Sequence, residues 1–215
     1  MTTATKPAKG RRAGVVLATR PLLGWRTVDL LTVAFLGVAF GVAYWGYGLI
    51  YNGPISALGL AFQPIFGLFV GFWFIAGVVG GLVIRRPGAA LACEVIAASV
   101  SALFGNQWGM ATVVSGLAQG LGAELAFAIF AYASFGPVVA ILAGALSAPL
   151  EWVYEIVTYF QGWSWSWQLA YLPLMVVSGV VFAGVGGWLL TRALAGAGAL
   201  NPFPPGQEVL EKRAV

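Results

Sequence analysis

Long apolar stretches alternate with short polar or glycine-rich segments along this chain, and the pattern predicts membrane-spanning helices. A helix needs about 20 consecutive, predominantly apolar residues to cross a bilayer. Stretches of roughly this length predict helices at residues 28–50, 60–84, 88–104, 110–132, 137–160 and 167–194. The fold class that follows is all-α and transmembrane, a six-helix membrane bundle.

The positions of the basic residues orient these helices. Cytoplasmic segments of membrane proteins carry an excess of Lys and Arg. Here the cations lie before the first helix, between the second and third, and at the C-terminal end: Lys6, Lys9, Arg11, Arg12, Arg20, Arg26, Arg85, Arg86, Arg192, Lys212 and Arg213. The loops at 51–57, 105–109 and 161–167 hold no charge. Both termini are therefore predicted to be cytoplasmic, with residues 1–26 a basic tail, 27–195 the membrane domain and 196–215 a second tail.

Composition narrows the class of protein further. Of the 215 residues, 60% are hydrophobic and 8% are charged, which excludes a soluble globule, a disordered chain and a nucleic-acid binder. The chain has no histidine, and therefore no His-based metal site or catalytic triad. It has no P-loop motif for ATP hydrolysis, and its single cysteine, Cys93, allows no internal disulfide. We expect no enzymatic activity, no cofactor and no metal.

Asp29 and Arg192 lie at the ends of predicted spans. Four acidic residues lie in the interior of the spans, where no basic residue accompanies them: Glu94, Glu124, Glu151 and Glu155. A charge at mid-bilayer costs roughly 2.5–3.5 kcal/mol, so such side chains face the protein interior or water. Helical spacing places Glu94, Gln119 and Glu155 in one pocket, with Glu151 one turn from Glu155 as a further candidate. Glu124 is rotated about 140° from Gln119 and is assigned to helix packing. The alternative for each acid is a neutral side chain bonded to a neighbouring helix.

The uncharged loops are rich in aromatic and amide side chains. An interfacial belt of Trp and Tyr accounts for single aromatic residues at helix ends. Three tryptophans that alternate within five residues of the last loop exceed this need, and they predict a lid over a flat aromatic or cationic ligand. The candidate ligand contacts in these loops are Asn106, Gln107, Trp108, Trp163 and Trp165.

The first predicted helix carries small residues at four-residue spacing. Gly37 and Gly41 form one such pair, and an Ala-xxx-Ala pattern runs beside it. Small-xxx-small patterns permit close approach of helices in membranes. They predict either packing within this chain or a docking face for another membrane subunit, formed with Ala34 and Val38.

With these residues in view, the chain resembles the YkoE family, whose members are substrate-binding (S) components of energy-coupling factor (ECF) transporters. The resemblance is carried by Trp-Arg-Thr-Val-Asp at 25–29, by Glu94 followed by Gly-Asn-Gln-Trp-Gly at 105–109, and by Gln-Gly-Leu-Gly-Ala-Glu at 119–124. It implies a six-helix bundle in the bacterial inner membrane that captures thiamine or its hydroxymethylpyrimidine precursor from outside. It also implies docking, through helix one, on a transmembrane coupling subunit driven by two ATP-binding subunits.

The acidic and aromatic residues identified above from the sequence pattern suit thiamine and its pyrimidine precursor. A carboxylate accepts a hydrogen bond from the pyrimidine amine, tryptophans stack on the rings, and an acidic cavity suits the thiazolium cation. Two other functions remain open at this stage. One is an autonomous proton- or cation-coupled carrier or channel that uses the four glutamates as a relay, and the other is a structural membrane subunit without a ligand.

Overall fold

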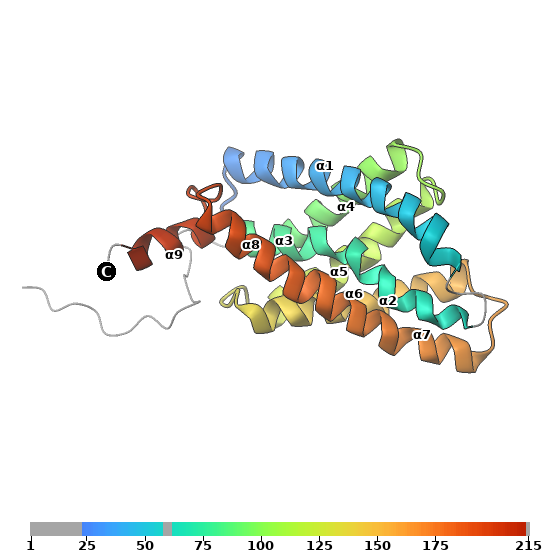
Figure 1. Cartoon of the computed structure of the whole chain (residues 1–215). Helices are drawn as coiled ribbons and strands as arrows, with labels where there is room; N and C mark the ends of the chain where they lie inside the picture. The colour runs from blue at the N-terminus through green and yellow to red at the C-terminus, as the bar shows by residue number, and fades with distance from the viewer. Residues whose placement is uncertain (1–22, 58–61, 214–215) are drawn as a thin grey trace, which may run out of the picture.

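The structure is a computed structural model that describes residues 23–57 and 62–213. Within this part of the chain it contains helices and no strand (Figure 1). The predicted basic tail at 1–26 lies outside the described residues except for its last four positions. The elements in chain order are α1 (Thr27–Ile50), η1 (Tyr51–Ile55), η3 (Gln63–Phe66), α2 (Gly67–Val70), η4 (Gly71–Phe74), α3 (Ile75–Ile84), α4 (Ala89–Leu103), α5 (Ala111–Ile129), α6 (Pro137–Thr158), α7 (Trp165–Ser178), η5 (Gly179–Gly186), α8 (Gly187–Gly196) and α9 (Pro204–Arg213).

The helices lie where the hydropathy pattern predicts them, with ends that differ by a few residues. Five stretches are long and apolar enough to cross a membrane: Thr27–Ile55, Gln63–Ile84, Ala111–Ile129, Pro137–Thr158 and Trp165–Gly196. The third predicted span is the 15-residue helix α4, which is shorter than a full crossing. Positions 60 and 61 of the second predicted helix lie outside the described residues. The chain is a multi-pass membrane protein.

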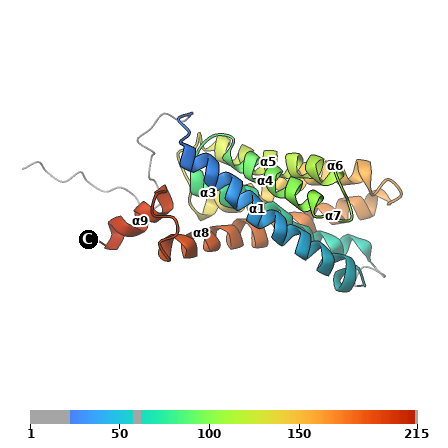
Figure 2. The same ribbon diagram turned by 90° about the horizontal axis from the view of Figure 1, so that it is seen from above.

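The second stretch, η3 to α3, forms the centre of the bundle (Figure 2). Of its most apolar window, 78% is buried, against 28–39% for the other four stretches. A helix that is apolar on every side is buried on every side, and here Phe74, Val79 and Ile84, which point to three different sides, are all buried. Around this centre, α1 packs on α4, α4 on α5, and α5 on α6.

Close backbone contact joins α6 to the last stretch, in which the π-helix η5 connects α7 and α8. A Cβ added at Gly144 on α6 would lie 2.2 Å from the carbonyl oxygen of Gly179. Only glycine allows two helices to approach this closely. The central stretch is tied to the same region, because the Gly71 N–H donates to Ser178 Oγ at 2.7 Å.

The C-terminal segment, expected as a polar tail, folds back on the bundle. Leu200 and Phe203 are buried, and α9 follows them. Glu208 on α9 pairs with Arg85 at the end of α3 at 2.6 Å. Leu200 and Phe203, with Val209 packed against the same core cluster, provide the buried contact that a free tail would lack. Residues 214–215 lie outside the described part.

The start of α1 meets this C-terminal segment at one end of the bundle (Figure 1). Asp29, expected as a first-turn acid near the helix dipole, is buried and pairs with Arg26 at 2.6 Å. It also accepts the Arg26 backbone N–H at 2.9 Å. The Arg26 guanidinium lies over the Phe203 ring, 5.4 Å from its centroid. Arg26 and Asp29 of the Trp-Arg-Thr-Val-Asp motif thus pair at the start of α1, and Arg26 packs this helix end against the C-terminal segment.

Candidate ligand-binding site

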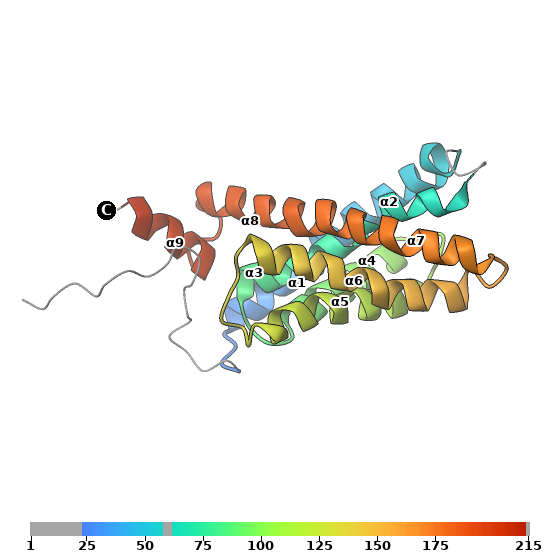
Figure 3. The same ribbon diagram turned by 90° about the horizontal axis from the view of Figure 1, so that it is seen from below.

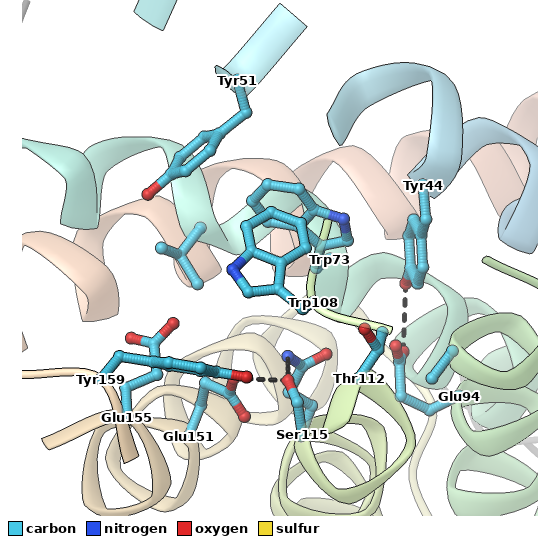
Figure 4. Close-up of a pocket in the computed structure, with 13 residues that line it drawn as sticks. Tyr44, Tyr51, Trp73, Glu94, Trp108, Thr112, Ser115, Glu151, Glu155 and Tyr159 are labelled. Atoms are coloured by element: carbon cyan, nitrogen blue, oxygen red, sulfur yellow. Dashed lines mark hydrogen bonds between the residues drawn. The ribbon is translucent and has the colours of Figure 1, made fainter. Parts of the chain in front are cut away.

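A pocket lies between α1, α4, α5 and α6, toward the end of the bundle that carries the uncharged loops (Figure 4). It encloses about 50 Å³. Three of its wall residues are glutamates, and within the described part of the chain no Lys or Arg lines it. The lining residues are Tyr44, Tyr51, Val70, Trp73, Glu94, Ala98, Trp108, Thr112, Ser115, Gln119, Glu151, Glu155 and Tyr159.

Two of the acids, Glu151 and Glu155, lie one turn apart on α6, as their spacing predicts. Ser115 donates to Glu151 Oε1 at 2.5 Å, and Gln119 Nε2 donates to Ser115 Oγ at 2.7 Å. The Tyr171 hydroxyl on α7 donates to Glu155 Oε2 at 2.7 Å. Ser115 and Gln119, which form a polar stripe on α5, therefore face the acidic pair, and Glu151 lines the pocket.

Glu94 forms the other end of the pocket and is completely buried. Its Oε2 accepts the Gly77 N–H at 2.7 Å and the Tyr44 hydroxyl at 3.2 Å. The Tyr44 oxygen in turn accepts the Ala76 N–H at 2.9 Å. One side of this carboxyl group is therefore held rigidly by the central stretch and by α1.

The remaining oxygens of two acids lack partners. Glu94 Oε1 and Glu151 Oε2 are buried and make no hydrogen bond with any described residue. A buried acceptor without a donor costs about 1–3 kcal/mol, and more when it is charged. A ligand that brings N–H donors or a positive charge to these oxygens removes this cost.

Three aromatic rings cover the pocket opposite the acids, as Figure 4 shows. Tyr51 and Trp73 meet edge to face with ring centroids 5.0 Å apart, and Trp73 meets Trp108 in the same way at 5.3 Å. Such contacts stabilise aromatic pairs by about 0.5–1.5 kcal/mol beyond their buried area. The Tyr159 side chain completes the wall on the α6 side.

Asn106 lies behind this roof and positions it. Its Oδ1 accepts the N–H groups of Trp108 and Gly109, at 3.0 and 2.8 Å, and its Nδ2 donates to Thr112 Oγ1 at 3.0 Å. Gly105 and Gly109, with φ of +80° and +57°, allow the tight turn. Asn106 was predicted as a ligand contact, but the structure uses its amide to hold Trp108 and Thr112 in the pocket wall.

Three other predicted contacts lie away from the pocket. Gln107 is exposed, and Trp165 is 68% exposed at the start of α7. Trp163 stacks on Phe160, with ring centroids 4.1 Å apart, and packs against Tyr171. Neither tryptophan lines the pocket, because helix α7 already begins at Trp165 and directs the rings to different sides. The lid of alternating tryptophans stays a prediction.

Tyr44, Trp73 and Tyr159 line the pocket without having been predicted from the sequence. For Tyr44 a signal was present, since Tyr44 and Tyr51 lie seven residues apart and therefore share a helix face. Trp73 gave none, because it lies in a stretch that is apolar on all sides. In such a stretch, periodicity does not identify the face toward the pocket.

Glu124 has the packing role predicted for it. It lies outside the pocket, and its carboxylate accepts the N–H groups of Gly88, Ala90 and Leu91 at 2.7, 3.0 and 3.1 Å. These are the first N–H groups of α4, which has no side-chain cap of its own. The Tyr132 hydroxyl donates to the same group at 2.6 Å. Burial and the Glu124 carboxylate both raise the pKa of Tyr132, so the phenol keeps its proton.

The predicted docking residues on α1 divide between two faces. Gly37 and Gly41 are buried against α4, where an added Cβ would lie 2.5 Å from side-chain atoms of Ile96 and Val100. Their assignment to a docking face is therefore wrong, and they serve packing within the chain. Ala34 and Val38 are exposed and lie on the flank of α1 beside this buried face.

The fold agrees with that of a solved transporter subunit. The chain aligns with a crystal structure of an S component of an ECF transporter with a TM-score of 0.82 and 32% identity, over 89% of this chain and 96% of that one. Together, the bundle and its pocket define a membrane-embedded substrate-binding subunit of the S-component class, which is non-catalytic.

Residues 28–150 match the family model described as the permease component of an ABC-type cobalt transport system. Over 191 residues the chain is 33% identical to "Putative HMP/thiamine permease protein YkoE" of Bacillus subtilis (strain 168), covering 88% of this chain and 94% of that one. The chain belongs to the YkoE family.

Proposed function

We propose that this chain captures thiamine, or its hydroxymethylpyrimidine precursor, as the S component of an ATP-driven ECF importer. The observation that carries the proposal is the pocket itself, in which three carboxyl groups meet without a basic side chain among the lining residues. Taking charged groups out of water costs several kcal/mol unless an opposite charge compensates them. A cationic ligand supplies that charge, and the aromatic roof suits flat rings.

The two ends of the pocket suit the two rings of thiamine. Glu94 Oε2 is saturated by protein donors while Oε1 is available, so this group suits the exocyclic amine of the pyrimidine. Glu151 and Glu155 lie one turn apart, where two negative charges repel each other. A thiazolium between them and the roof relieves this repulsion. The precursor, which lacks the cation, would depend on Glu94 and the roof alone.

Binding requires the aromatic roof to move. A cavity of about 50 Å³ is far smaller than the roughly 300–1,000 Å³ of sites for drug-sized ligands. Tyr51 is the roof residue that we expect to move, because it lies in the short π-helix η1, which contains Pro54. The rings that close the pocket would therefore open outward and then stack on the ligand.

The family description names cobalt, but the pocket favours an organic ligand. The chain has no histidine, and within the described residues no three His, Cys, Asp or Glu side chains come close enough to hold a metal ion. Transition-metal sites use imidazole, thiolate or carboxylate ligands, whereas the three-ring cover found here offers surfaces for stacking.

The membrane arrangement and partners follow from the same proposal. The described cations gather at the α9 end of the bundle, so we place both termini in the cytoplasm of a bacterial cell and the pocket toward the outside, with α4 as a sixth crossing. The exposed face of α1 around Ala34 and Val38 would dock on the transmembrane coupling subunit, which two ATP-binding subunits drive.

Calorimetric titration of the purified protein tests the ligand. We expect saturable thiamine binding with Kd below about 10 μM, and its absence would reject thiamine. Glu155→Gln should weaken thiamine about tenfold or more and leave the precursor unaffected, whereas Glu94→Gln should weaken both, because bonds to charged groups are worth about 1.5–3 kcal/mol. Glu211→Gln, an exposed change on α9, is the matched control.

Transport assays separate the importer subunit from the autonomous carrier. In proteoliposomes that contain this chain alone, we expect thiamine to bind without accumulating inside. Uptake in the absence of ATP and partner subunits would favour the carrier that uses its glutamates as a relay. Cobalt added as the chloride should neither bind nor compete with thiamine.

A further inference from the structure

A second cavity lies at the opposite end of the bundle, where α8 and α9 pass the start of α6 (Figure 3). It encloses about 270 Å³ and shares no lining residue with the acid-lined pocket. Its walls combine cationic, aromatic and small side chains: Leu82, Arg85, Phe135, Gly136, Pro137, Trp188, Thr191, Arg192, Pro205, Glu208 and Lys212.

The charges of this cavity do not balance. Arg85 is buried, and its guanidinium pairs with Glu208 and lies over the Phe135 ring, 4.9 Å from the centroid. Arg192 and Lys212 have no carboxylate within 4.0 Å in the described part of the chain. All seven acidic side chains of the sequence lie among the described residues, and Glu208 is the one acid that lines the cavity there.

Arg192 is held at the mouth of the cavity by its neighbour on α8. Its guanidinium lies over the Trp188 ring, 5.7 Å from the centroid. A guanidinium stacked on an aromatic face keeps its N–H groups free at the edge, where they fit the oxygens of a phosphate. Lys212 adds a point charge from α9 on the other side of the cavity.

The cavity lies where the apolar helices end. Pro137 begins the α6 span, and Gly196 ends the last span one turn beyond Arg192. Apolar side chains continue from the cavity along the outer surface, with Leu189 on α8 and Val138 on α6 each more than half exposed. A headgroup in the cavity would thus be continuous with acyl chains along these residues.

We propose that this cavity binds a phosphate group, presented by the headgroup of an anionic phospholipid. Basic pockets between membrane helices at the lipid headgroup level have the chemistry to bind such headgroups. The two unpaired cations bind the phosphate oxygens, Trp188 lies at the interface, and the exposed apolar side chains contact the lipid tails. The lipid would bridge α6, α8 and α9 and hold the C-terminal helix against the bundle.

Native mass spectrometry of the purified full-length protein with phosphatidylglycerol tests this site. We expect one retained lipid, with affinity reduced about fivefold by Arg192→Gln and further by Arg192→Gln combined with Lys212→Gln. Arg213→Gln is the matched control, because Arg213 donates to the Gly196 carbonyl and does not line the cavity. Arg192, Lys212 and Arg213 are all exposed, and thermal unfolding checks that each variant is folded.

Four results would overturn the proposal. The first is equal retention by the wild-type protein and the double variant, and the second is an equal loss in Arg213→Gln. The third is displacement of the lipid by millimolar inorganic phosphate, which would assign the cavity to a soluble anion. Phosphatidylcholine should be retained less well than phosphatidylglycerol, and equal retention would likewise contradict an anionic lipid site.

Discussion

The buried glutamates of this protein differ in whether neighbouring protein groups satisfy their hydrogen bonds. Glu124 satisfies backbone donors at the start of α4, so its carboxylate is a helix cap supplied by another helix. Glu94 and Glu151 each keep one buried oxygen without a partner, so their chemistry is incomplete without a ligand. An acid satisfied by its own protein stabilises the fold, and an acid left unsatisfied indicates a binding site.

Glu124→Gln tests this distinction at the residue scale. The amide presents an NH₂ group where the carboxylate accepts N–H donors, so we expect the free energy of unfolding to fall by about 1.5–3 kcal/mol. Thiamine affinity at low temperature should stay unchanged. Thermal unfolding in detergent, followed by tryptophan fluorescence, measures the first quantity and calorimetry the second. A loss of affinity without a loss of stability would contradict the capping role.

Backbone contact between elements shapes this bundle as much as side-chain packing does. The π-helix η5 lies against α6 at Gly179 and Gly144, and α1 lies against α4 at Gly37 and Gly41. These close approaches leave little room for side chains within the interfaces. The acids on α6 and the polar stripe on α5 can therefore meet across a narrow pocket.

Two alanine substitutions test whether close backbone contact between helices stabilises the bundle. In Gly144→Ala the new Cβ meets the η5 backbone at 2.2 Å, so we expect a loss of about 1–3 kcal/mol in stability. Gly46→Ala on α1 meets nothing within 4 Å, and the better helix former should raise stability by about 0.5–1 kcal/mol. Melting temperatures that move equally for the two variants would disprove the close-packing argument.

Charge divides the whole molecule into two ends. The described cations lie near the start of α1, in the turn between α3 and α4, and around α8 and α9, whereas the acid-lined pocket has glutamates and aromatic rings. By the positive-inside rule we expect the basic end to face the cytoplasm.

Cysteine labelling tests the orientation at the scale of the molecule. Cys93 is buried and can be replaced by alanine, after which Gly162→Cys and Asn201→Cys each place one thiol on an exposed site at opposite ends of the bundle. In intact cells, a membrane-impermeant maleimide should label only the cysteine at 162. Labelling of the cysteine at 201 alone would reverse the proposed orientation.

The sequence by itself determined the helices, the separation of charge along the chain and the three pocket acids, because hydropathy, charge and the 3.6-residue period act locally. It also distinguished Glu124 from the others by helix rotation alone. Only the tertiary structure decided that Gly37 and Gly41 face α4, that Asn106 supports Trp108, and that Trp73 rather than Trp163 or Trp165 covers the pocket. These outcomes depend on which helix packs against which face. A single helix with apolar residues on every side does not carry that information.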